Sequence, residues 1–197
     1  MPSSITRVVR DDHERLPRLL RRVVRPGPSQ ERWREELLRL LHAHRTAERT
    51  VLTSDVLAPV GDVARIAALD LDALDRDLGD AVQALADSPL DSPALSGLGE
   101  RLGTLLAQHA ASSDRLLHAL EDAVPRKQVR LLGGRYTEAR DAVLQDDGAA
   151  EPPPRRLDLP RAELYELARK AGIEGRSAMS RGELIAELQQ RQQHESS

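Results

Sequence analysis

Apolar residues recur at intervals of three and four over most of the first 145 positions, and this spacing predicts amphipathic helices. Four long stretches show the pattern, and turn-forming segments such as PGPS (26–29) and SPLDSP (88–93) separate them. The first predicted helix starts after Ser4, and the second runs from Ser29 to near Pro59. The third runs from about Val63 to Ala86, and the fourth runs from Ser92, with Pro93 in its first turn, to Pro125. Four such helices with short connections favour an all-α fold, an antiparallel up-down four-helix bundle.

The rest of the chain follows a different plan. A shorter helix over roughly 126–144 completes the first domain, and the proline-rich stretch QDDGAAEPPPRR (145–156) is typical of a linker. Two short helices are then predicted in LPRAELYELARKAGI and SRGELIAELQQR, where Ser180 and Glu183 form a capping box and Gly172 suits a helix end. We therefore expect a bundle with a trailing helix at 1–145, a linker at 146–157, and a helix–extension–helix module at 158–191.

Composition narrows the possible chemistry. The chain has three aromatic residues, Trp33, Tyr136 and Tyr165, which favours helix packing over a sheet and leaves no aromatic platform for stacking bases. It has no cysteine, which excludes disulfides and thiolate metal sites. No apolar run reaches the roughly 20 residues of a membrane span, and charges come too early for a secretory signal, so we expect a cytoplasmic protein. The net charge of −3 gives no overall attraction to nucleic acid.

Histidine and glutamate interrupt the apolar stripes of three predicted helices. In LLHAHRTAERTVL (40–52), His44 and Glu48 lie one turn apart and continue the leucine row of the second helix. His13 lies on the apolar row of the first helix and His109 on that of the fourth. Each buried polar group costs roughly 1–3 kcal/mol unless it is paired. A metal ion bound by all four would satisfy them together, and bundle cores hold such sites; a cluster whose members hydrogen-bond to one another is the alternative.

These residues resemble the hemerythrin-type HHE cation-binding bundle. That family has a histidine in the first helix, H-x-x-x-E in the second and a histidine in the fourth, and LEDAVPRKQVRLLGGRYTEARDAV (120–143) is similar to the segment that follows its last helix. The resemblance covers roughly residues 4–145. It implies a non-heme di-iron centre, held by histidines and bridging carboxylates, that serves oxygen or nitric oxide binding, iron handling or redox sensing.

The chain departs from that pattern on its second and third helices. Arg49 replaces a glutamate that is common directly after the H-x-x-x-E motif. Leu71 holds the inward position of the third helix where the family has a histidine, and its neighbour Asp70 faces inward only with a twist. The resemblance therefore implies a reduced site rather than two irons.

The fourth helix departs as well. Ser113 stands where the family often has a carboxylate. Asp114 has the H-x-x-x-x-D spacing of the older hemerythrins, but it lies roughly 140° from His109 around the helix and needs a π-bulge to face inward. We expect at most one ion, iron, zinc or manganese. Its candidate ligands are His13, His44, Glu48, His109 and Asp114; a core without any ion is the equal alternative.

Residues 158–189, DLPRAELYELARKAGIEGRSAMSRGELIAELQ, resemble the helical N-terminal segment of transcription termination factor Rho and, more distantly, SAP modules. The resemblance implies a unit that contacts nucleic acid or a protein partner. From residue 155 onward, eight Arg or Lys face seven Asp or Glu, which is a weak electrostatic signal. The candidate phosphate contacts are Arg169, Lys170, Arg176 and Arg181, with Arg155 and Arg156 upstream; a solvated surface of mixed charge is the alternative.

The sequence thus predicts a hemerythrin-like metal sensor or store with a reduced, mononuclear site, fused to a nucleic-acid- or partner-binding module. The alternative is a metal-free interaction or regulatory protein on the same fold, whose ion site has decayed. No Ser–His–Asp order, glycine-rich phosphate loop or carboxylate pair predicts an enzyme.

Overall fold

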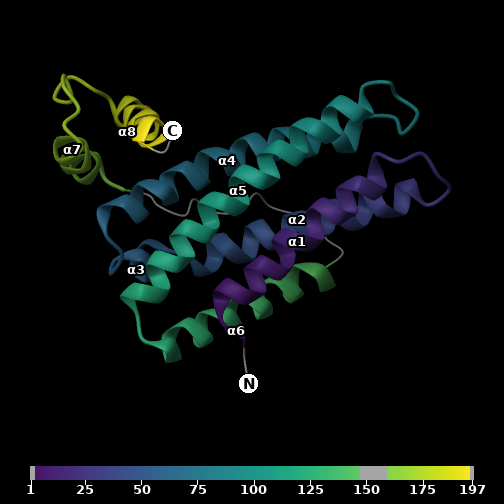
Figure 1. Ribbon diagram of the computed structural model, residues 1–197, viewed down its shortest axis with the longest axis horizontal. Coiled ribbons are helices and arrows are strands. Elements are labelled where there is room, and N and C mark those ends of the chain that lie inside the picture. The colour runs from purple at the N-terminus through teal and green to yellow at the C-terminus, as the bar shows by residue number, and fades with distance from the viewer. Residues whose placement is uncertain (1–2, 147–158, 196–197) are drawn as a thin grey trace.

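The computed structural model describes residues 3–146 and 159–195, and every regular element in these ranges is a helix (Figure 1). The helices are α1 (Ile5–Val23), α2 (Gln30–Val51), α3 (Ser54–Leu57), α4 (Asp62–Asp87), α5 (Leu95–Ala123), α6 (Arg126–Gln145), α7 (Arg161–Lys170) and α8 (Arg181–Glu195). None of these helices combines the length and apolar content that a membrane crossing requires. The all-α prediction is confirmed for the described residues, and the predicted linker lies almost entirely outside them.

The long helices pack as neighbouring hairpins. Helices α1 and α2 form one hairpin and α4 and α5 form another, and α1 lies against α5 (Figure 1). Helix α6 packs across α1 and α2. This arrangement directs the apolar stripes of the helices toward a shared interior.

Several predicted helix ends are wrong by a few residues. Helix α2 ends at Val51 rather than near Pro59, because Leu52 and Thr53 leave the helical region and a separate short helix, α3, follows. Helix α5 begins at Leu95 rather than at Pro93, and Ser92 Oγ accepts the backbone N–H of Ala94 instead of capping the helix. Tight turns preceding α5 delay it, and helical periodicity alone does not encode such turns.

Two apolar clusters fill the two ends of the long helices. One cluster contains Ile5 and Val9 of α1 with Val51 and the last part of α5. The other contains Leu16 to Val23 of α1 with Leu37 and the first part of α5. Between the two clusters, the buried side chains include Asp12 of α1, His44 of α2 and His109 of α5. The polar residues of the interior therefore meet at mid-height between two hydrophobic layers.

The C-terminal helices form a small module against α4. Gly172, at φ +68°, ends α7 in a Schellman motif, in which the Ile173 N–H reaches the Ala168 carbonyl at 2.9 Å. The predicted capping box is present: Ser180 N–H donates to Glu183 Oε2 at 2.6 Å, and Glu183 N–H donates to Ser180 Oγ at 3.3 Å. Pro160 takes the N-cap position of α7 rather than its first turn.

The module shares its core with the long helices. The shared apolar cluster includes these module residues: Leu159, Leu164, Leu167, Ala168, Ile173, Leu184 and Leu188. At the rim, Lys170 Nζ lies 2.5 Å from Asp62 Oδ2, and Arg65 pairs with Glu163. The module is thus docked on α4 by apolar contacts and by two ion pairs.

Candidate metal centre

Four predicted ligands converge at the centre of the long helices. One donor atom each of His13, His44, Glu48 and His109 lies within 4.8 Å of all the others. Helix α1 supplies His13, α2 supplies His44 and Glu48 one turn apart, and α5 supplies His109. His13 is half-buried and the other three are fully buried. Three helices therefore bring together four of the five residues that the sequence predicted as ligands.

The distances within this group suit a single small ion. His44 Nε2 lies 3.2 Å from His13 Nε2 and 3.1 Å from His109 Nε2. Glu48 Oε2 lies 3.1 Å from His109 Nε2 and 3.9 Å from His44 Nε2. A four-coordinate ion with bonds of about 2.1 Å separates its ligand atoms by about 3.4 Å. Three imidazole nitrogens and one carboxylate oxygen thus stand at separations typical of a shared ion.

Hydrogen bonds fix which nitrogen of His44 faces the centre. The Tyr136 hydroxyl donates to Asp12 Oδ2 at 2.6 Å and lies 2.7 Å from His44 Nδ1. Because the only proton of that hydroxyl is committed to Asp12, its oxygen accepts the Nδ1–H of His44. His44 consequently turns the lone pair of Nε2 toward the other two imidazoles.

The neighbours of His109 and Glu48 also favour lone pairs that point toward the centre of the group. His109 Nδ1 lies 3.5 Å from Asp75 Oδ1, which favours a proton at Nδ1 and a lone pair at Nε2. Ser113 Oγ donates to Glu48 Oε1, so that the other carboxylate oxygen points toward His109. With the His109 proton on Nδ1, lone pairs of two imidazoles and a carboxylate face one another at 3.1–3.9 Å, an arrangement that a cation stabilises; a proton on His109 Nε2 would instead make the contacts with His44 and Glu48 hydrogen bonds.

His13 lies on the outer side of the group, since it is the one member that is only half-buried. Burial lowers the pKa of His13 well below its ordinary value, and the neighbouring His44 and His109 lower it further. The imidazole is therefore neutral near pH 7 and has a lone pair to offer. Within the described residues its Nδ1 has no hydrogen-bond partner.

Beside this group lies a buried ion-pair cluster that the sequence did not predict. Arg49, which the sequence shows only as a departure from the family, places its guanidinium NH1 2.8 Å from Asp72 Oδ1 and 3.1 Å from Asp75 Oδ2. All three side chains are buried. Leu71 fills the inward position of α4 as predicted and is fully buried. Helix α4 thus contributes carboxylates that pair with a fixed positive charge, which argues against a second metal ion here.

Asp114 and Asp70 stay outside the four-residue group. Helix α5 is regular from His109 through Asp114, so the π-bulge that would turn Asp114 inward is not formed. Asp70 is half-buried, and burial raises its pKa to about 6 although Arg115 acts in the opposite direction. Neither carboxylate takes part in the centre.

Sequence reasoning missed the residues that contact the ligands from behind. Tyr136 is fully buried and continues an apolar row of α6 through Val129 and Leu132, at steps of three and four. Asp75 likewise falls between Leu71 and Leu78 at steps of four and three. The spacing in the sequence therefore indicates the inward position of both Tyr136 and Asp75. Asp12 gives the same signal, because it is buried and lies three residues after Val9 and four before Leu16.

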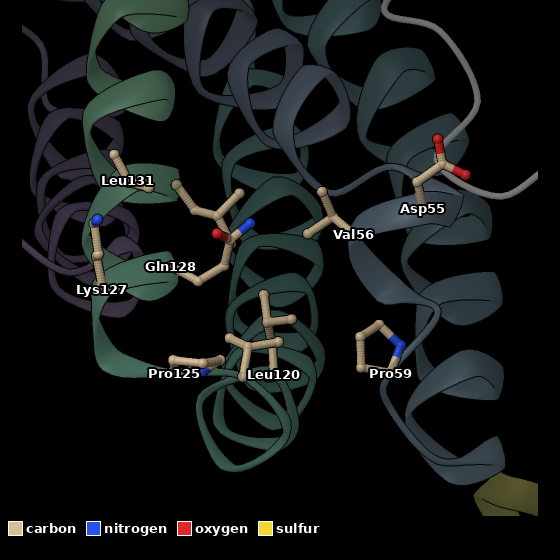
Figure 2. Close-up of a pocket in the computed structure, with 10 residues that line it drawn as sticks. Asp55, Val56, Pro59, Leu120, Pro125, Lys127, Gln128 and Leu131 are labelled. Atoms are coloured by element: carbon tan, nitrogen blue, oxygen red, sulfur yellow. The ribbon is translucent and has the colours of Figure 1, made fainter.

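A separate pocket of about 640 Å³ lies between α3 and the corner where α5 meets α6 (Figure 2). Its wall is mostly apolar and includes Val56, Pro59 and Leu120. Lys127 and Leu131 lie on one side of the opening and Asp55 on the other (Figure 2). The pocket contains none of the four converging residues, so it is distinct from the centre.

The comparisons with known proteins bear on the C-terminal module. Residues 158–196 match the family model described as Rho termination factor, N-terminal domain. This confirms the resemblance of this segment, hereafter the Rho N-terminal-like segment, which is well under half of the chain. No curated protein and no solved structure matches the chain.

Within the Rho N-terminal-like segment, all four predicted phosphate contacts already have partners in the chain. Two are in ion pairs and two contact backbone carbonyls. The contacts are Arg169 with Glu166 at 2.8 Å, Lys170 with Asp62 at 2.5 Å, Arg176 with the Ile173 carbonyl at 2.9 Å, and Arg181 with the Leu159 carbonyl at 3.1 Å. Arg176 also lies over the ring of Tyr165, 5.6 Å from its centroid. The other two candidates, Arg155 and Arg156, lie outside the described residues.

Proposed function

We propose that the chain is a metal-binding protein of the hemerythrin-like type, in which α1, α2, α4 and α5 form a four-helix bundle around one divalent transition-metal ion. The ligands are His13, His44, Glu48 and His109. The observation that carries the proposal is the convergence of their four donor atoms within 4.8 Å from three different helices. The protein then senses or stores the ion in the cytoplasm.

The donor set agrees with this function. Imidazoles with one carboxylate suit Fe(II), Zn(II) and Mn(II). The bound ion supplies the positive charge that the facing lone pairs call for. Glu48 balances part of that charge, and the half-buried His13 provides the side from which the ion is exchanged. Arg49 keeps the neighbouring carboxylates Asp72 and Asp75 paired, which supports one ion rather than two.

Metal analysis of the untagged full chain tests this proposal. We expect close to one equivalent of iron, zinc or manganese per chain, lost in His44→Ala and kept in His118→Ala, because His118 is exposed and lies outside the group. An ion present at about 1,000 times its Kd adds about 4 kcal/mol to the unfolding free energy. Chelation should therefore lower the melting temperature by roughly 10 °C.

The second candidate is a metal-free interaction protein. Leu71 and Ser113 favour it, since neither provides the ligand expected at its position, and the Ser113–Glu48 hydrogen bond engages one carboxylate oxygen without an ion. It predicts background metal content and a melting temperature that chelator leaves unchanged. That pair of results would contradict the metal-binding proposal and support this one.

For the Rho N-terminal-like segment, we infer a role in binding nucleic acid. The family match supports it, whereas the internal partners of Arg169, Lys170, Arg176 and Arg181 mean that binding has to replace existing contacts. Fluorescence anisotropy with a single-stranded RNA should show affinity that falls with salt, and Arg169→Ala should reduce the slope of log K against log salt by about 1. Absence of salt-dependent binding would contradict this role and favour a protein partner.

A further inference from the structure

Helix α6 reaches the centre through a chain of three hydrogen bonds. Arg140 NH1 donates to Asp12 Oδ1 at 3.0 Å, Tyr136 OH donates to Asp12 Oδ2 at 2.6 Å, and His44 Nδ1 lies 2.7 Å from the Tyr136 oxygen. Both oxygens of Asp12 are thereby used. Tyr136 and His44 are fully buried, and Asp12 is almost so. A residue of α6 is thus the direct partner of a ligand on α2.

The direction of this chain follows from the protonation of its members. Arg140 NH1 and the Tyr136 hydroxyl both donate to Asp12, so the two carboxylate oxygens of Asp12 act as acceptors. Since the one hydroxyl proton of Tyr136 is used in its bond to Asp12, the Tyr136 oxygen accepts from His44. The bond between Tyr136 and His44 therefore needs a proton on His44 Nδ1.

We propose that Tyr136 is a positioning residue that holds His44 in the tautomer and ring orientation required for ion binding, with Asp12 and Arg140 orienting Tyr136 in turn. This inference rests on the proposed function. Without the hydroxyl, the imidazole is able to carry its proton on Nε2, where it blocks ligation, or to turn away. Histidine ligands generally donate their second N–H to such a partner, and loss of that partner typically costs 10–100-fold in metal affinity.

The same contacts make α6 respond to the ion. Gly133 packs so closely on the start of α1 that a methyl group would overlap the Ser3 carbonyl oxygen, which fixes the first half of α6. Tyr136 and Arg140 connect the second half to His44 and Asp12. An ion that orders His44 consequently also orders α6. Amide hydrogen exchange in residues 126–145 should slow when the ion binds.

The chain's two tyrosines supply a variant and its matched control. In the full chain, Tyr136→Phe keeps the buried ring and removes the hydroxyl, and Tyr165→Phe does the same in the Rho N-terminal-like segment. Zn(II) affinity is measured by competition with a chromophoric chelator. We expect the Kd of Tyr136→Phe to rise 10–100-fold and that of Tyr165→Phe to stay within about twofold of wild type.

A second readout separates positioning from general stability. The visible absorption bands of bound Co(II) report ligand geometry and should shift in Tyr136→Phe but not in Tyr165→Phe. A lower melting temperature with unchanged Zn(II) Kd and unchanged Co(II) bands would overturn the inference. If Tyr136→Phe does not fold, Arg140→Gln loosens the same chain from its far end and should raise the Kd by about 3–10-fold, a smaller effect than loss of the direct partner. An unchanged Zn(II) Kd in Arg140→Gln would overturn the inference.

The outcomes also separate this inference from the proposed function. If the wild-type chain binds no Zn(II) or Co(II), the proposed function fails and this inference fails with it. If wild type binds Zn(II) and Tyr136→Phe binds it equally well, only the positioning role is wrong.

Discussion

The buried centre and the Rho N-terminal-like segment treat their charged and polar residues in opposite ways. At the centre, nitrogens of His44 and His109 lie 3.1–3.9 Å from the Glu48 carboxylate, and a cation bound there would contact all three. In the segment, each predicted phosphate-binding cation already contacts an acceptor of the same chain, as Lys170 contacts Asp62. The four predicted cations of the matched segment thus have partners within the chain, whereas no family match covers the four residues that converge at the centre.

The difference shows what ligand binding has to do in each place. At the centre a ligand adds a charge to a preformed set of acceptors, and little has to move. In the segment, a ligand that binds these cations would have to replace ion pairs and carbonyl contacts, of which the Lys170 pair with Asp62 involves α4. We therefore expect the loss of a buried charge beside the centre to lower the unfolding free energy more than the loss of a charge at the surface of the module.

The largest effect is expected from Arg49→Met. The substitution removes the guanidinium between Asp72 and Asp75, and breaking a buried pair by losing one partner typically costs 3–5 kcal/mol. Urea denaturation measures the loss of unfolding free energy. Arg65→Met, which breaks the surface pair with Glu163, is the control and should cost about 0–1 kcal/mol. Equal losses of unfolding free energy in Arg49→Met and Arg65→Met would contradict the expected difference between the buried interior and the surface of the module.

A smaller effect is expected from Ser113→Ala. It removes the hydroxyl that donates to the buried Glu48 carboxylate, a type of hydrogen bond worth about 1.5–3 kcal/mol. The matched control is Ser112→Ala, in which the buried Ser112 hydroxyl loses a contact with the exposed Arg115 at 3.0 Å, for about 0.5–1 kcal/mol. Denaturation of both variants with metal removed checks the difference. If Ser113→Ala is the milder change, Glu48 is held by other groups.

The smallest effect concerns the half-buried Asp70. Its pKa is raised to about 6, mainly by burial, above the roughly 3.9 of the unfolded chain. The folded state therefore binds the proton more tightly, and the stability that this contributes is full below about pH 4 and is lost as the pH rises through about 6. Asp70→Asn should remove this pH dependence and add roughly 1 kcal/mol at pH 7, after allowance for solvent screening at a part-exposed site. An unchanged profile between pH 4 and 7 would contradict the raised pKa.

Helical periodicity in the sequence predicted much of the fold, namely the long helices and the faces that they bury. It predicted that His13, His44 and His109 lie on inward rows, and in the structure all three lie between the two apolar clusters. The spacing also places Asp12 on the buried row of α1 with Val9 and Leu16, but it does not reveal which groups Asp12 contacts. Its role depends on how α6 packs across α1 and α2, and no single-helix pattern encodes that packing. Helix ends near Pro59 and Pro93 were wrong for the related reason that short turns there depend on local backbone geometry.

The contacts behind the ligands were the least predictable part of the centre. Tyr136 and Asp75 follow apolar spacing, yet a polar residue on a stripe does not reveal its partner. Arg49 was visible in the sequence only as a missing glutamate. Its pairing with Asp72 and Asp75 becomes apparent once α2 and α4 are placed side by side.

Calorimetric titration of the metal-free full chain with Zn(II) tests the central claim most directly. We expect one Zn(II) per chain for wild type and for His118→Ala, and no specific binding for His44→Ala. A stoichiometry of two, or saturable binding that survives His44→Ala, would contradict a single ion held by His13, His44, Glu48 and His109. So would the absence of any binding to the wild-type chain.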